Sequence, residues 1–209
     1  MTEPQSTFLN INPELISFSN GEIERIKDMT EALLRAEIDT NIDPRMPRNG
    51  AIKSTYDRQG SVVIEAHRRQ GKVIIEKRDD GLYVNEKKII LYRSISQRGD
   101  CIDGDSLRVE LESQEIQSAS ILDFLLDNRE YIPEEWKNLC INCDAFFIFF
   151  WGTIYKDMDG NLLVRSLAND DGEIEECSTL LDRCFCYFCP SAVLVDAETW
   201  VDYPRIFGT

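Results

Sequence analysis

An uncharged apolar run, AFFIFFWGTIY at residues 145–155, constrains the fold of this chain more than any other segment. A transmembrane helix needs about 18 or more apolar residues, so this run is too short to span a bilayer. It predicts instead a strand in the protein core. Residues 161–168 (NLLVRSLA) predict a second strand. Asp159 and Gly160 lie between the two segments and favour a tight hairpin.

Shorter apolar segments upstream predict an antiparallel β-meander over residues 61–95. Turn residues separate these segments, which read SVVIEA, KVIIEK, LYV and KIILYRSI. Val73 and Ile75 alternate with other residues, so one face of the meander is expected to be partly apolar and the other mixed. Near the end of the chain, residues 173–196 predict one or two further strands.

Helical periodicity is clearest at residues 21–39 (GEIERIKDMTEALLRAEID), where we predict a helix that ends before Pro44. A second helix is predicted downstream, where Ile121 and Leu125 repeat at helical spacing, and Pro133 is suited to begin a short third helix. Together these patterns predict an α+β fold, with an antiparallel meander and C-terminal antiparallel strands packed by a few helices.

Charge is distributed very unevenly along the 209 residues, whose net charge is −15. We divide the chain into an N-terminal helical segment (1–52), a basic β-meander (53–99) and an acidic α+β region (100–209), and expect the last two to form one compact unit. Lys and Arg outnumber Asp and Glu by 11 to 6 in the meander, whereas the acidic region has 7 against 23. A strongly acidic surface repels phosphate backbones and anionic membranes and attracts basic proteins.

The N-terminal residues, MTEPQSTFLNINPEL, lack the features of a secretory signal, so we expect a cytoplasmic location. Thiols are normally kept reduced there, and we therefore expect the seven cysteines not to form a disulfide framework. His67 is the only histidine, and we interpret it as an exposed residue near a turn. The chain has no glycine-rich phosphate loop, GxSxG or HExxH motif, so the prediction leans against an enzyme and against a bound cofactor.

Six of the cysteines lie in the acidic region between Cys140 and Cys189, apart from Cys101 near its start, and the densest segment is CFCYFCP at 184–190. One interpretation is a zinc-stabilised module, because thiolates at such spacings are able to complete a tetrahedral site. The favoured interpretation is a core strand that ends at Pro190, because free cysteine behaves as a small buried hydrophobe. The zinc candidates are Cys140, Cys143, Cys184, Cys186 and Cys189.

The basic meander also suggests nucleic-acid binding as an alternative. The candidate phosphate contacts are Arg68, Arg69, Lys72, Lys77 and Arg78. Acidic residues occur in nearly every strand of the same segment, and the signature of an RNA-binding sheet is missing. We therefore expect these basic side chains to pair with acidic groups of the same chain.

Three segments of the C-terminal half carry a resemblance: PEEWK at 133–137, FWGTIYKDMDGNLLVR at 150–165 and PSAVL at 190–194. With the leucine-rich helix before them, they resemble a group of uncharacterised bacterial proteins. The resemblance implies a bacterial or phage origin and no particular chemistry. Relatives in that group are rich in Trp and Asn where this chain reads LLDRCFCYFC.

These observations favour a non-enzymatic cytoplasmic interaction protein: an accessory, regulatory or inhibitory factor. We expect its acidic surface to bind a partner protein with a basic surface, in a setting such as bacterial defence or counter-defence. Nucleic acid is an alternative partner, and no membrane association is expected.

Overall fold

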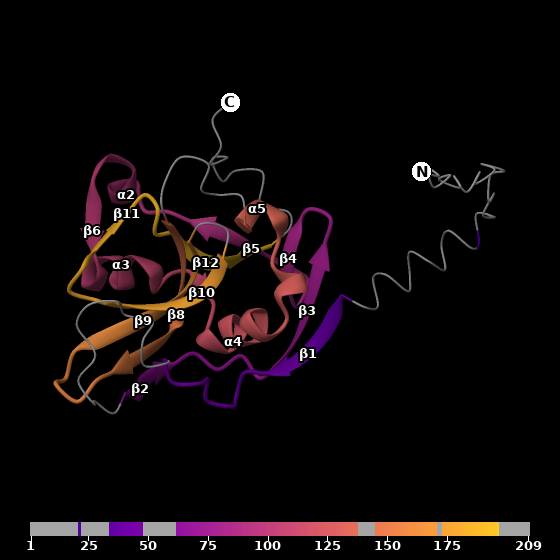
Figure 1. Cartoon of the computed structure of the whole chain (residues 1–209), viewed down its shortest axis with the longest axis horizontal. Coiled ribbons are helices and arrows are strands. Elements are labelled where there is room, and N and C mark those ends of the chain that lie inside the picture. Colours follow the sequence, from indigo (N-terminus) through magenta and orange to yellow (C-terminus); the bar gives the residue numbers. More distant parts are fainter. Residues whose placement is uncertain (1–20, 22–33, 48–61, 138–144, 171–172, 197–209) are drawn as a thin grey trace, which may run out of the picture. The chain divides into compact units, whose positions relative to one another are not determined.

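The structure is a computed structural model that describes residues 21, 34–47, 62–137, 145–170 and 173–196. The chain divides into two compact units, residues 1–33 and 34–209. The fold described below is that of the second unit (Figure 1).

A ten-stranded, mostly antiparallel sheet forms most of this unit. Eight strands follow one another across it in the order β1-β3-β4-β5-β12-β8-β9-β10, while β2 pairs with β8 and β7 with β12. The strands of this sheet are β1 (Arg35–Asp39), β2 (Val63–His67), β3 (Lys72–Arg78), β4 (Gly81–Val84), β5 (Lys87–Tyr92), β7 (Glu115–Ile116), β8 (Ala145–Lys156), β9 (Leu162–Asp170), β10 (Glu173–Leu180) and β12 (Ser191–Val195). A separate two-stranded sheet pairs β6 (Cys101–Asp103) with β11 (Cys184–Cys186).

Short helices connect and cover these strands. They are α2 (Ile95–Gly99), α3 (Gly104–Leu111), α4 (Ala119–Asp127), the 3-10 helix η1 (Arg129–Tyr131) and α5 (Glu134–Lys137). The predicted α+β class, with a large antiparallel sheet and a few packing helices, is confirmed. Within the described residues, no helix is long and apolar enough to cross a membrane.

The predicted meander is correct for β3, β4 and β5, which pair in sequence order. The prediction is wrong for β2, which leaves the meander and pairs antiparallel with β8, as in Val63 opposite Lys156. The predicted hairpin at Asp159 and Gly160 is present: β8 pairs with β9, and Gly160 has a positive φ of 85° that suits glycine.

The predicted helix over residues 21–39 is wrong at its C-terminal end, because residues 35–39 form strand β1. β1 pairs with β3 along its whole length, so that Arg35 lies opposite Glu76 and Asp39 opposite Lys72. Ala36 and Ile38 pack against the core between these charged positions. Pairing with a distant strand therefore outweighs the local helical periodicity. Residues 22–33 lie outside the described part of the chain.

The sequence of strand β8 is apolar because both faces of the strand are covered. Phe146, Ile148 and Phe150 belong to one core cluster, together with residues of α4, η1 and α5. Phe149 and Trp151 point to the opposite face and belong to a second cluster, which includes Leu107 of α3 and Phe185 of β11. A strand buried on both faces reads as a continuous apolar run. The small β6–β11 sheet is therefore anchored on one face of the large sheet.

Candidate functional site

The pairing of β6 with β11 brings together cysteines that are far apart in the sequence. Cys186 lies directly opposite Cys101, and Cys184 lies opposite Asp103. Alternate residues of a strand point to the same face, so Cys101, Cys184 and Cys186 share one face of this small sheet. With Cys189 in the turn that follows, we call these four residues the cysteine module.

The opposite face of β11 holds the module against the main core. Phe185 is fully buried, and its ring centre lies 5.0 Å from those of both Phe149 and Trp151 on β8. The interpretation of CFCYFCP as a strand with cysteines in the core is wrong, because Cys184 is exposed and Cys186 is only partly buried. The aromatic residue between them fills the core instead.

A disulfide joins Cys101 to Cys184, with 5.6 Å between the two Cα atoms. The expectation that the thiols stay reduced is therefore wrong for this pair. The two residues are 83 positions apart in sequence, and the disulfide links β6 to β11. Cys186 and Cys189 are free thiols.

Cys186 and Cys189 form a dithiol beside this disulfide. Their Sγ atoms lie 3.8 Å apart, and the Cys189 backbone N–H donates to the Cys186 carbonyl at 3.0 Å. The buried amide of Gln97 on α2 donates to both carbonyls, at 3.1 Å to Cys186 and 2.9 Å to Cys189. These bonds fix both ends of the Cys-x-x-Cys turn.

Arg93 is a buried cation next to this turn, only 6% exposed. Its Nε donates to the Tyr187 carbonyl at 2.6 Å, and its guanidinium lies 4.5 Å from the centre of the Tyr187 ring. Burial lowers the pKa of Arg93, whereas Tyr187 and Cys189 oppose that shift. Among the described residues, Nη1 of Arg93 has no hydrogen-bond partner although it is buried. An N–H of this cation is thus available for a nearby anion.

Burial also acts on the Cys189 thiol. It raises the pKa of Cys189 to about 12, and the neighbouring Cys186 adds to the increase while Arg93 opposes it. Cys177 lies elsewhere, on β10, and burial raises its pKa as well. The module thus contains one thiol, Cys189, that is held strongly in its protonated form.

Of the five zinc candidates, the structure brings Cys184, Cys186 and Cys189 into the module. Cys140 and Cys143 lie outside the described residues. Cys101, which the sequence did not single out, completes the module. Within the described ranges, no group of three or more His, Cys, Asp or Glu side chains is placed to hold a metal ion.

His67 is not the exposed turn residue that we expected. It is partly buried, with Nε2 2.8 Å from the Thr40 carbonyl oxygen and Nδ1 2.7 Å from Oγ1 of Thr153. A carbonyl only accepts, so the proton belongs on Nε2, and the Thr153 hydroxyl then donates to Nδ1. The same Thr153 oxygen accepts from the Ala119 backbone N–H at 3.0 Å. His67 thus connects β2, β8 and the start of α4.

The five candidate phosphate contacts all have partners within the chain. Lys72 lies 3.0 Å from Glu37, Arg78 2.6 Å from Glu76, and Arg69 3.4 Å from Asp43. The other two donate to backbone carbonyls: Lys77 to Glu130 and Ile132, and Arg68 to Gln114. The Glu37 hydrogen bond raises the pKa of Lys72, and the Glu76 hydrogen bond raises that of Arg78.

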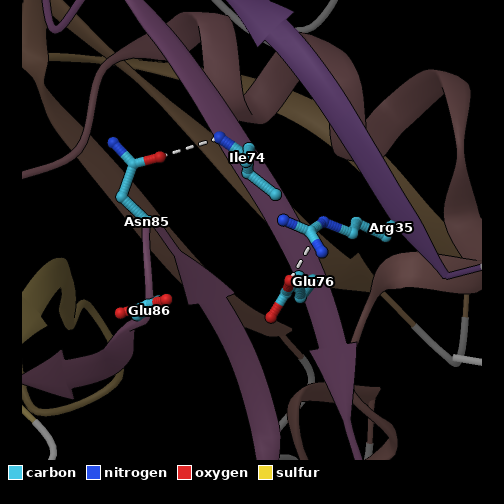
Figure 2. A pocket seen from close by; sticks show the side chains of 5 residues that line it. All are labelled: Arg35, Ile74, Glu76, Asn85 and Glu86. Atoms are coloured by element: carbon cyan, nitrogen blue, oxygen red, sulfur yellow. Dashed lines mark hydrogen bonds and ion pairs between the residues drawn. The ribbon is translucent and has the colours of Figure 1, made fainter. Parts of the chain in front are cut away.

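A hollow of about 200 Å³ lies over β1, β3 and the turn between β4 and β5. Arg35 pairs with Glu76 at 3.2 Å, and Oδ1 of Asn85 accepts from the Ile74 backbone N–H. Figure 2 shows both pairs in this hollow, with Glu86 apart from them. Ligand pockets usually measure roughly 300–1,000 Å³. This hollow is smaller, and the main charges in it pair with each other, so we assign it no ligand.

No protein-family model, curated protein or solved structure matches this chain. We therefore infer function from the residues themselves. Sequence reasoning missed Cys101 because its partners lie more than 80 positions away. Its position at the start of a three-residue strand gave no local signal.

Proposed function

We propose that this chain is a non-enzymatic cytoplasmic protein-binding factor, with an accessory, regulatory or inhibitory role, that binds a partner with a basic surface. One observation carries the proposal: three of the five basic candidate residues of the meander pair with acidic side chains of the chain, whereas the region from residue 100 onward has 23 acidic against 7 basic residues. Neighbouring opposite charges leave little positive potential for phosphates, and the acidic excess remains to attract a basic partner.

Strand β10 supplies a surface for such a partner. It ends the strand order of the large sheet and, within the described residues, pairs on one side only, with β9. Glu173 and Glu175 on β10 are exposed, and the sequence from 170 to 176 contains five acidic residues and no basic one. An open strand edge binds an extended segment through main-chain hydrogen bonds. We therefore assign this edge to an extended segment with basic side chains.

The biological setting we propose is bacterial defence or counter-defence. We infer the bacterial part of this setting from the segments 133–137, 150–165 and 190–194, which resemble a group of uncharacterised bacterial proteins. Small acidic chains suit such settings, where neutralising a basic target is useful.

The test measures binding of a synthetic peptide in which lysine alternates with valine, by calorimetry at low and high salt. We expect binding that weakens with salt, and a Glu173→Lys/Glu175→Lys variant that binds about 5- to 30-fold more weakly, as expected for a loss of 1–2 kcal/mol. The control, Asp79→Lys/Glu112→Lys, changes the net charge equally at exposed positions away from β10. No binding at low salt would overturn the proposal, and equal losses in both variants would overturn the assignment to β10.

Nucleic-acid binding by the meander is the outcome that would replace this proposal. It would appear as a mobility shift of DNA or RNA at low salt, abolished by reversing the charges of Arg68, Arg69 and Lys72. The pairing of these side chains with Asp43, Glu37 and the Gln114 carbonyl argues for no shift.

A further inference from the structure

We propose that the cysteine module is a thiol–disulfide exchange site, in which the Cys186–Cys189 dithiol takes over the disulfide that joins Cys101 to Cys184. This activity is separate from the proposed binding function and does not depend on it.

The first support is that Cys101 faces two cysteines on β11. It is bonded to its diagonal neighbour Cys184, and it lies directly opposite Cys186. Directly opposed residues of antiparallel strands have Cα atoms roughly 4.5–5.5 Å apart, which is within the range that a disulfide spans. The Cys101 sulfur is therefore able to pair with either partner without movement of the backbone.

The second support is that a resolving thiol is already in place. Cys189 has its Sγ 3.8 Å from that of Cys186, in a turn whose two ends are held by Gln97. A thiol in contact with the attacking cysteine is what releases a mixed disulfide. Burial raises the pKa of the Cys189 thiol to about 12 and Arg93 opposes that shift, so this thiol is protonated in the state with the Cys101–Cys184 disulfide.

The exchange needs no external oxidant or reductant. The Cys186 thiolate attacks the Cys101 sulfur, a Cys101–Cys186 bond forms, and Cys184 leaves as a thiolate that takes up the proton lost by Cys186. The Cys189 thiolate then attacks the Cys186 sulfur, and Cys101 leaves and takes up the proton lost by Cys189. One disulfide is broken and one is formed, so the number of thiols stays constant.

Arg93 supplies a third, independent support. Its Nη1 is buried without a hydrogen-bond partner among the described residues, and its charge interacts with Cys189. A cation beside this turn favours the charged form of a neighbouring thiol, because opposite charges attract. Arg93 is thus placed to stabilise the thiolates of the exchange.

The cytoplasmic location that we propose fits this role. Disulfides in that compartment are usually transient, and they serve in catalysis or redox sensing. Exchange would move the covalent link from between β6 and β11 to within the turn that carries the exposed side chains of Tyr187 and Phe188.

Disulfide mapping of the full chain tests the proposal. Protein with one disulfide per chain is held at neutral pH without redox reagents, quenched with acid, alkylated and digested with trypsin. Arg98, Arg108 and Arg183 then leave Cys101 on one peptide and Cys184, Cys186 and Cys189 on another, apart from the other cysteines. We expect a mixture of Cys101–Cys184 and Cys186–Cys189 forms that reaches a constant ratio. When the incubation is repeated in glutathione buffers of different redox ratio, the ratio of the two forms should not change, because both contain the same number of thiols.

A trapping variant sharpens the test. In Cys189→Ser, we expect the Cys101–Cys186 bond to accumulate, with Cys184 alkylated, whereas Cys177→Ser should match the wild type. Only Cys101–Cys184 in the wild type, at every time point, would overturn the proposal, and that result does not depend on how the variants fold. If all four cysteines resist alkylation until a chelator is added, the module is a metal site and the proposal of an exchange site is wrong.

Discussion

The guanidinium of Arg165 lies 2.7 Å from the carboxylate of Asp123, and both side chains are largely buried where α4 meets β9. Nε of Arg165 also pairs with Glu176 at 2.8 Å, and Nη1 donates to the Arg45 carbonyl and to the Tyr155 hydroxyl. Burial acts to lower the pKa of Arg165, but its polar neighbours outweigh that effect and raise it. The result is a fully paired charge inside the fold.

Replacement of Arg165 by methionine should destabilise the protein by about 3–5 kcal/mol, because it leaves the Asp123 and Glu176 carboxylates without their buried partner. Urea unfolding measures this loss. The control is Arg183→Met, since the Arg183 side chain is 63% exposed, and its effect should stay within about 0.5 kcal/mol. A loss below about 1 kcal/mol for the Arg165 variant would contradict the structural role of this pair.

The sequence predicted the strands of this network but not its contacts. NLLVRSLA shows a strand with one basic residue, and nothing local shows that Arg165 points inward to α4 and β10. Hydrophobic periodicity indicates which face of an element is buried, whereas the partner of a buried charge is determined by tertiary packing. For the same reason, the sequence did not predict that β2 pairs with β8.

The next prediction concerns Gly104, the first residue of α3. A Cβ at this position would overlap the Leu181 carbonyl oxygen and lie 2.8 Å from the Phe185 ring. Gly104→Ala should therefore destabilise the protein by about 1–3 kcal/mol through overpacking. Thermal unfolding tests this, with Gly99→Ala as the matched control, because a Cβ on Gly99 has no heavy atom within 4 Å. Equal stability of the two variants would argue against the close packing of α3 on β11.

The turn between β4 and β5 contains two residues with positive φ, Asn85 at 49° and Glu86 at 69°. Glutamate is strained in this conformation and glycine is not, so Glu86→Gly should stabilise the protein by about 0.5–1 kcal/mol. The same change at Glu112, where φ is −59°, should destabilise it, because glycine there only adds freedom to the unfolded chain. Urea midpoints of the two variants should thus shift in opposite directions. A shift of both to lower urea would contradict the strain at Glu86.

The next prediction concerns the free energy of unfolding at high pH, which depends on the buried side chains of Tyr83 and Tyr155. Burial raises the pKa of Tyr83 and that of Tyr155 to about 12, and Asp80 adds to the effect at Tyr83. In the unfolded chain these groups ionise near pH 10, so between pH 10 and 12 the folded state binds more protons than the unfolded state. Their contribution to stability is full below pH 10 and is lost as the pH rises through 12.

Tyrosinate absorbance during an alkaline titration measures this directly. Tyr83 and Tyr155 should titrate late, burial also raises the pKa of Tyr131, and Tyr83→Phe should remove one late component while leaving the earlier ones unchanged. A titration in which all tyrosines ionise together near pH 10 would contradict the burial of these phenols.

The cysteine module shows where prediction from the sequence succeeded and where it stopped. CFCYFCP predicts a strand that ends at Pro190, whereas β11 already ends at Cys186, and its core residue is Phe185 and not a cysteine. A two-residue period shows which side chains share a face, and only packing decides which face is buried. In β1 the type of element was mispredicted. RAEID consists largely of good helix formers, which favours a helix, but it forms a strand by pairing with β3.

Strand β12 has a consequence for how this protein is made. It is the last described strand along the chain, yet it lies between β5 and β8, pairing with both. While the ribosome is still adding residues before Ser191, β5 and the part of β8 around Phe149 lack the strand that lies between them, and their backbone groups on that side stay open, whereas the end of β8 is already paired with β2. Completion of the sheet must therefore wait for the end of synthesis of this region, and until then the nascent chain offers apolar strand edges to chaperones.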